Sequence, residues 1–320
     1  MRRGRSARPA LGRAIAAVAV VAATVGVTAA PAAAARPAAC NGDARLCARP
    51  LDRAVLPATH NSMSAASLGW AIPNQQVGIP EQLAAGIRGF LIDTYYAHRG
   101  PDGQLVTDPT PLPESELYLC HVSCGIGATP LAEALAGMRG FLRANPANVL
   151  MIVNEDYTRP EDFARVVRRT KLIRHVYRGQ LGPRWPTLRK LIKRRKQVVM
   201  TTQGDGGSFR WYRAAYRGLL QETPYTWATP DLLTDPARWP ASCQPNRGGT
   251  SGGLFLLNHW SPPVAPSPAT SAIVNAKETL IGRSNACRFV RGRWPTLIAV
   301  DMFQSGGLFP AVRHLNGAIG

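Results

Sequence analysis

Beyond its first 35 residues, the 320-residue chain contains no apolar run of the about 20 residues that a membrane-spanning helix needs. It has no internal repeat, no coiled-coil tract and no acidic tract, so repeat architectures and long fibrous helices are excluded. No Cys-x2-Cys pair occurs, which argues against a structural zinc site. Carboxylates are scarce as well, with 19 Asp and Glu against 38 Lys and Arg. What remains is the composition of a strongly basic globular domain.

The N-terminal segment has the order of a secretory signal peptide. Five arginines open it: Arg2, Arg3, Arg5, Arg8 and Arg13. An apolar run over 14–30 follows, and Ala33–Ala35 ends it with small residues. An uncleaved membrane anchor is the alternative, which the short, Ala-rich run disfavours. We therefore predict a signal peptide over 1–35 and a single secreted, extracellular domain over 36–320, long enough to bury a large core.

Cysteine usage agrees with export. All six cysteines lie after residue 35: Cys40, Cys47, Cys120, Cys124, Cys243 and Cys287. An even number in an exported chain indicates disulfides rather than free thiols. Proximity in the sequence favours the pairs Cys40–Cys47, Cys120–Cys124 and Cys243–Cys287 among the pairings that six cysteines allow.

The positive charge is unevenly distributed. The formal net charge is +19, and five of these charges precede Arg36, which leaves +14 for the predicted mature chain. Much of the excess lies between Arg165 and Lys196. Such a stretch attracts anionic surfaces in a salt-dependent way, and outside the cell an anionic lipid or wall polymer suits it better than nucleic acid. The alternative interpretation is an ordinary solvated helix face.

Short apolar runs alternate with helical patterns along the chain. The runs predict strands over 54–59, 88–95, 117–122, 149–154, 197–202, 254–258 and 297–302. Helical patterns fall over 80–87, 130–145, 160–169 and 186–193, and loops over 204–207, 224–251 and 261–270. Strands that are apolar throughout and alternate with helices indicate a parallel α/β sheet. The fold class predicted is a single-domain (β/α)8-type TIM barrel.

Polar side chains gather where the predicted strands end. In chain order they are His60 and Asn61, Asp93, His121, Glu155 and Asp301. In a barrel the carboxyl ends of all strands meet on one face, where active sites are built. One polar residue after a strand means little, but this series predicts a catalytic site.

These segments, taken in order, resemble the X domain of phosphatidylinositol-specific phospholipase C. The run LPATHNSM over 56–63 resembles the first motif of that domain, and GIRGFLID over 86–93 resembles its second strand. Leu119–His121 and the NEDY run over 154–157 resemble the third and fourth, and Ala299–Asp301 resembles the last. The resemblance covers nearly all of the chain after residue 35 and is strongest to a secreted, cysteine-containing branch.

The resemblance implies a PLC-like phosphodiesterase, a phosphoric diester hydrolase or phosphoinositide phospholipase C-like lyase that cleaves a phospholipid or glycophospholipid headgroup. His60 is then the general base and His121 the general acid, roles that suit side chains titrating near neutral pH. The late Asp301 would orient His60. The implied protein is a monomer that can contact an anionic membrane surface.

The resemblance also implies a cofactor, Ca²⁺. In the calcium-dependent branch, an Asn after the first His and acidic residues on strands two and four bind the ion, and here Asn61, Asp93 and Glu155 match. These are the hard oxygen ligands that Ca²⁺ prefers. Leu91 departs from the pattern, because that branch carries an acid there. The neighbouring Asn154 leaves open which residue of strand four faces the site.

Two other functions remain open at this level. The missing acid at Leu91 is compatible with a lipid- or wall-binding barrel that has little or no activity. A glycerophosphodiester or sphingomyelin phosphodiesterase is the other alternative, but those enzymes use a Glu-x-Asp pair where this chain has Leu91 and Asp93.

Overall fold

The computed structural model describes residues 39–179, 185–225, 229–260 and 266–319. The predicted signal peptide over 1–35 lies outside these ranges. The chain from Pro37 onward forms one compact unit. No helix in the described ranges combines the length and the hydrophobicity that a membrane span requires.

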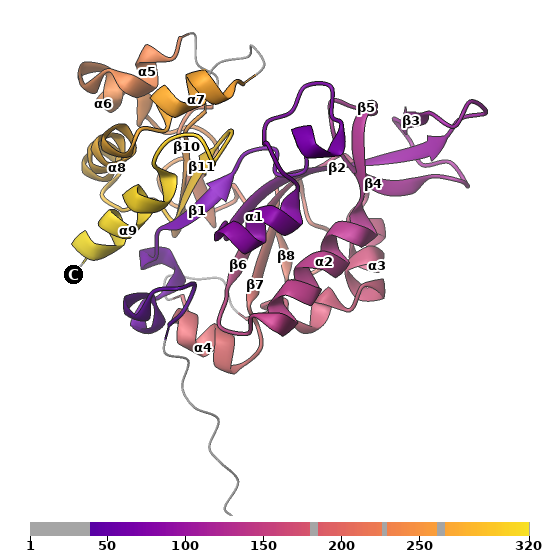
Figure 1. Cartoon of the computed structure of the whole chain (residues 1–320). Helices are drawn as coiled ribbons and strands as arrows, with labels where there is room; N and C mark the ends of the chain where they lie inside the picture. The colour runs from indigo at the N-terminus through magenta and orange to yellow at the C-terminus, as the bar shows by residue number, and fades with distance from the viewer. Residues whose placement is uncertain (1–38, 180–184, 226–228, 261–265, 320) are drawn as a thin grey trace, which may run out of the picture. The chain divides into compact units, whose positions relative to one another are not determined.

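Eight parallel strands form a curled sheet in barrel order (Figure 1). They are β1 (Leu56–Thr59), β2 (Gly89–Arg99), β6 (Leu150–Asp156), β7 (Val198–Thr202), β8 (Tyr212–Ala214), β9 (Leu220–Glu222), β10 (Leu254–Asn258) and β11 (Leu297–Val300). Their order is β8-β7-β6-β2-β1-β11-β10-β9, so the last strand pairs with the first. In the described residues, no ladder joins β8 to β9. The predicted TIM barrel is confirmed, with an opening at that one position.

Side chains alternate between the two faces of this sheet. One hydrophobic cluster on the inner face includes Leu56, Met151, Val153, Leu256 and Leu297. A second cluster, under the helices, includes Phe90, Ile152 and Ile298. Both faces are therefore apolar, as the uninterrupted hydrophobic runs predicted. The interior is tight at Gly89, where a Cβ atom would come within 2.6 Å of side-chain carbons of Ala58 and Leu297.

Helices cover the outer face. They include α1 (Ile79–Ala85), α2 (Leu131–Ala144), α3 (Pro160–Arg169), α4 (Leu188–Lys193), α8 (Lys277–Arg291) and α9 (Leu308–Ala318). The helical pattern predicted over 130–145 is confirmed as α2, whose apolar stripe of Leu131, Leu135, Met138 and Leu142 is buried. No helix lies between β7, β8 and β9, and the sheet opens where this connection is shortest.

The third predicted strand does not belong to the barrel, contrary to the prediction. The run over 117–122 is β4 (Glu116–His121), which pairs antiparallel with the outer half of β2 and is not a barrel strand. β2 continues past the barrel edge and carries a hairpin of β3 (Leu105–Asp108), β4 and β5 (Ser123–Pro130) (Figure 1). Apolar alternation marks a strand but not its direction, because both directions bury side chains with the same period.

The predicted long loops over 224–251 and 261–270 are corrected in part. They contain α5 (Asp231–Thr234), α6 (Trp239–Ser242) and the start of α7 (Pro268–Val274). Pro240 and Pro268 occupy the first turns of α6 and α7, where proline initiates a helix instead of breaking one.

The three predicted disulfides are confirmed: Cys40–Cys47, Cys120–Cys124 and Cys243–Cys287. No cysteine in the described residues is free. The second disulfide closes the turn between β4 and β5, so it constrains the residues directly after the hairpin strand that ends in His121.

Candidate active site

One pocket at the carboxyl ends of the strands brings the predicted residues together. His60, Asn61, Asp93, His121 and Glu155 all line it. Asp301 lies directly behind His60 and completes the predicted set. His60, Asn61 and Asp301 follow β1 and β11, and Glu155 lies near the end of β6, as expected. Asp93, predicted at a strand end, instead lies within β2 at the last residues that pair with β6. His121 reaches the same place from the antiparallel hairpin, because β2 carries β4 over the mouth of the barrel.

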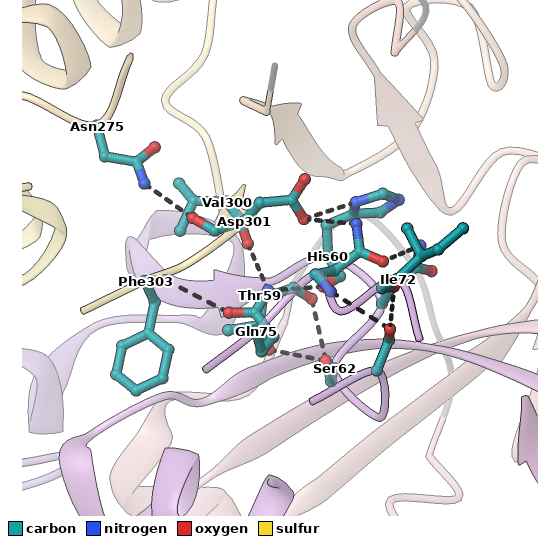
Figure 2. Close-up of polar contacts among 12 residues, drawn as sticks. Thr59, His60, Ser62, Ile72, Gln75, Asn275, Val300, Asp301 and Phe303 are labelled. Atoms are coloured by element: carbon teal, nitrogen blue, oxygen red, sulfur yellow. Dashed lines mark hydrogen bonds and ion pairs between the residues drawn. The ribbon is translucent and has the colours of Figure 1, made fainter. Parts of the chain in front are cut away.

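His60 is held from one side by Asp301. The His60 Nδ1 atom lies 2.9 Å from Asp301 Oδ1, and Asn74 Nδ2 donates to the same oxygen over 3.2 Å. Asn275 Nδ2 donates to the backbone carbonyl of Asp301 (Figure 2). The fixed Asp301 carboxylate accepts a hydrogen bond from Nδ1 of His60. This leaves Nε2 as the ring nitrogen of His60 that is available for proton transfer.

Trp260 holds the ring of His60 from a second direction. The two rings stack with centroids 3.8 Å apart and an interplanar angle of 1°. No local pattern in the sequence reveals this contact. The preceding residue, His259, is fully buried away from the pocket: its Nε2 lies 2.9 Å from the Val274 carbonyl, and burial lowers its pKa to about 3.

His121 is presented by a distorted strand end. The register of β4 against β5 shifts between Cys120 and His121, and Val122 has a φ of +65°. Irregularities of this kind redirect a side chain away from the regular ladder. Burial lowers the pKa of His121, and the nearby His60 lowers it further, whereas Asp301 and Glu155 act in the opposite direction.

Asp93 and Glu155 form a carboxylate pair. They are direct partners in the parallel register of β2 and β6, so their side chains lie side by side on the inner face. Burial raises the pKa of Asp93 well above its ordinary value, and Glu155 raises it further. Asn154 points the other way, donating to Thr94 Oγ1 and Tyr212 Oη, which identifies Glu155 as the pocket residue of strand four.

A hydrogen-bonded chain that the sequence did not reveal lines the far side of the pocket. Gln203 donates from Nε2 to Glu155 and accepts at Oε1 from Arg247, and Arg247 pairs with the buried Glu222. The Arg247 guanidinium lies over the ring of Tyr216 at 4.4 Å. Arg247 falls within a segment predicted as loop, where no local pattern distinguishes a pocket residue from a solvated one.

The oxygen atoms of Asn61, Asp93 and Glu155 fit a hard cation in kind. Within the described residues, no group donates a hydrogen bond to the Asp93 carboxylate, and its neighbour is the carboxylate of Glu155, which accepts from Gln203 and Tyr157. Asn61 uses Nδ2 to donate to Asn74, so its Oδ1 remains an acceptor. No group of three or more His, Cys, Asp or Glu side chains in the described part of the chain is placed to hold a metal ion, so these residues supply only part of a coordination shell.

Two solved structures share the fold at low sequence identity. Phosphatidylinositol-specific phospholipase C of Staphylococcus aureus superposes with a TM-score of 0.56 at 13% identity, over 86% of this chain and 95% of that one. The Listeria monocytogenes enzyme of the same name gives 0.53 at 15% identity, over 85% and 97%. The chain therefore shares the TIM-barrel fold of these two enzymes.

The family follows from the sequence comparison. The model of the PI-PLC X domain matches residues 46–316, and the chain belongs to this family. A PI-PLC X domain-containing protein of Arabidopsis thaliana is 22% identical over 271 residues, which is 77% of this chain. The match spans only 56% of that relative's own length. The resemblance found in the sequence is thus confirmed for family and fold.

Proposed function

We propose that the protein is a secreted, monomeric phosphodiesterase that cleaves the headgroup of a phospholipid or glycophospholipid by acid–base catalysis between His60 and His121. The observation that carries this proposal is that both histidines line one pocket while Asp301 anchors Nδ1 of His60. A binding barrel without activity would have no need for an oriented imidazole facing a second imidazole.

The proposed reaction uses the two rings in sequence. His60 takes the proton from a headgroup hydroxyl next to the phosphate, and that oxygen attacks phosphorus. The bond between phosphorus and the glycerol oxygen breaks, and His121 gives its proton to the departing diacylglycerol oxygen. A cyclic phosphate leaves with the headgroup. Proton transfer at both oxygens avoids free alkoxides, which is the gain that general acid–base catalysis provides.

The rest of the pocket suits a polyol headgroup. Glu222, Arg247, Asn258 and Tyr225 line the wall that belongs to β9, β10 and the connection between them. Carboxylate, guanidinium, amide and phenol groups can together donate to and accept from several hydroxyls. A headgroup held there would place its phosphate between that wall and the histidines.

The test of this function is hydrolysis of phosphatidylinositol vesicles by the purified chain, followed by phosphorus NMR. Release of a cyclic inositol phosphate would support the headgroup and the mechanism together. If no phosphodiester in a panel that also includes glycerophosphodiesters and sphingomyelin is cleaved, the enzymatic proposal is wrong.

The pH profile should report the buried position of His121. An acid must be protonated to act, and burial lowers the His121 pKa below its ordinary value of about 6.5. We therefore expect kcat/KM to fall as pH rises through that lowered pKa. A bound phosphate stabilises the imidazolium, so the corresponding fall in kcat should lie at higher pH. If kcat and kcat/KM both fell at the same pH, and that pH lay above neutrality, the assignment of His121 as the acid would be contradicted.

We further propose that Ca²⁺ binds between Asn61, Asp93 and Glu155. When bound, the ion would supply positive charge to balance the substrate phosphate. The two carboxylates are adjacent and neither belongs to an ion pair in the described residues, so a divalent cation would relieve their repulsion. Leu91 also lines the pocket, where an apolar side chain offers no ligand, so water or substrate must complete the shell.

Calcium should stabilise the folded protein, and Asp93→Asn should remove this effect. A ligand at 100 times its Kd stabilises the native state by about 2.7 kcal/mol, which a thermal melt detects as a higher Tm. Asp156→Asn is the matched control, because Asp156 follows Glu155 but accepts from the Gly204 amide outside the pocket. A parent protein whose Tm and activity ignore both calcium and chelator would rule out the metal.

A further inference from the structure

A basic segment of the chain contains no acidic residue at all. From 163 to 204 the sequence has no Asp or Glu. The described basic side chains that it exposes are Arg165, Arg168, Arg169, Lys171, Arg174, Arg178, Lys190, Lys193, Arg194 and Arg195. Of these, only Arg165 has a carboxylate partner within the described residues, at Asp162. The segment therefore carries a concentrated positive charge of which, among the described residues, only Arg165 is paired with a carboxylate.

Part of this charge converges around one histidine. His175, after the short helix η4 (Leu172–Arg174), has its pKa lowered by burial and then by Arg139, Lys196 and Arg195. Lys196 donates to the Arg174 carbonyl over 2.6 Å, and its own pKa is lowered by burial and by Arg178. We call the five basic residues Arg139, Arg174, Arg178, Arg195 and Lys196 the amino-end cluster. They come from α2, from η4 and its C-terminal flank, and from the turn before β7.

The amino-end cluster lies at the opposite end of the barrel from the pocket. The Val198 amide at the start of β7 donates to the His175 carbonyl, whereas Gln203, directly after β7, lines the pocket. The strand between them has five residues and spans roughly 16 Å. In Figure 1, α4 lies beyond the lower ends of β6 and β7, and the β3–β5 hairpin lies at the upper end of the sheet.

The position of the amino-end cluster discriminates between two kinds of anionic partner, a membrane surface and a soluble polymer. If the cluster sat on a membrane, the pocket would face away from the bilayer that holds its proposed substrate. Membrane-binding faces also insert apolar side chains. Three exposed large apolar residues, Val122, Tyr157 and Tyr225, line the pocket, whereas none lies between 165 and 196 in the described residues. The cluster thus has charge without apolar anchors.

We propose that the amino-end cluster, with the adjacent Lys193 and Arg194, binds a linear polymer with a phosphate backbone. Such a polymer presents regularly spaced negative charges and needs no apolar contact, and guanidinium groups bind phosphate in a bidentate manner. Binding at this end leaves the pocket open to solvent on the other end of the barrel.

The experiment uses the full mature chain and long-chain inorganic polyphosphate as the probe, with Kd measured by calorimetry across a series of salt concentrations. The test variant combines Arg174→Gln, Arg178→Gln and Arg195→Gln. The control variant combines Arg210→Gln, Arg217→Gln and Arg313→Gln, which removes the same charge from exposed positions elsewhere. We expect the test variant to bind at least about tenfold more weakly, with a log–log salt slope shallower by roughly 2, since each contact with a single-stranded polyphosphate-type backbone contributes about 0.7.

The outcomes separate this proposal from the enzymatic one. The test variant should keep wild-type turnover, because none of its three residues lines the pocket, so loss of polymer binding alone supports the proposal. Equal weakening in the control variant would show a general charge effect and overturn it. Failure of the wild type to bind polyphosphate, with binding to anionic vesicles through the same residues, would overturn it in favour of a membrane. A Kd of the wild type that does not depend on salt concentration would also overturn the proposal. Circular dichroism of both variants verifies that they are folded.

Discussion

We expect His60→Ala and His121→Ala each to lower kcat/KM for the cleaved phosphodiester by at least about 10²-fold while the fold remains intact. Loss of a positioned acid or base typically costs 10² to about 10⁴ in rate. Both side chains are partly exposed in the pocket, so truncation leaves a hole open to water rather than a core cavity. Because the two rings act on the same phosphoryl transfer, the double variant should be little slower than the less active of the two single variants.

The chain provides its own control for the His60 variant. His98 also pairs through Nδ1 with a buried carboxylate, Asp108, at 2.7 Å, and its side chain is 21% exposed against 20% for His60. It lies on the β2–β3 hairpin outside the pocket. His98→Ala should therefore leave kcat/KM nearly unchanged. Full turnover in His60→Ala or His121→Ala would disprove the acid–base pair.

Asp301→Asn should reduce kcat by about 10²- to 10⁴-fold with little change in KM. The Asp301 carboxylate accepts the Nδ1 proton of His60, so it fixes the tautomer whose Nε2 can act as a base. An asparagine can turn its amide nitrogen toward Nδ1 and so stabilise the opposite tautomer, in which Nε2 already carries a proton. In the serine-protease triad, a change of the same kind has an effect of this size.

Asp108→Asn is the matched control for this variant. Both aspartate side chains are 4% exposed and both pair with a histidine Nδ1, but Asp108 also accepts from Ser115 and lies outside the pocket. The comparison separates the cost of losing a buried His–Asp pair from the loss of an oriented base. A decrease in Tm without a decrease in kcat for Asp301→Asn would reduce Asp301 to a structural role.

Much of the barrel was predictable because its signals are local. Uninterrupted apolar runs such as 149–154 reflect strands buried on both faces, and β6 occupies Leu150–Asp156. The stripe of α2 repeats at the helical period. The Cys40–Cys47 and Cys120–Cys124 disulfides were predictable because each closes a short segment of the chain. Cys243–Cys287 spans 44 positions and was predictable as the one pair that remained.

The candidate site was predictable in its members but not in its architecture. His60, Asp93 and Asp301 were identifiable because the ends of parallel strands meet on one face of a barrel. His121 was found for the wrong reason, since β4 runs antiparallel to β2. Its arrival at the same pocket depends on the length of β2 beyond the barrel edge and on the irregular end of β4.

By itself, the sequence determined the family, six of the eight barrel strands, the paired cysteines and the residue types of the candidate site, because each leaves a motif or a period within a short window. The two short strands β8 and β9 were not predicted. Only the tertiary structure decided that Trp260 stacks on His60, that Arg247 reaches the pocket wall, and that the amino-end cluster lies opposite the pocket. The stacking of Trp260 on His60, for example, joins residues that are 200 positions apart (260 − 60). Contacts at such separations are set by how the strands close around the core, and they leave no periodic trace in the chain.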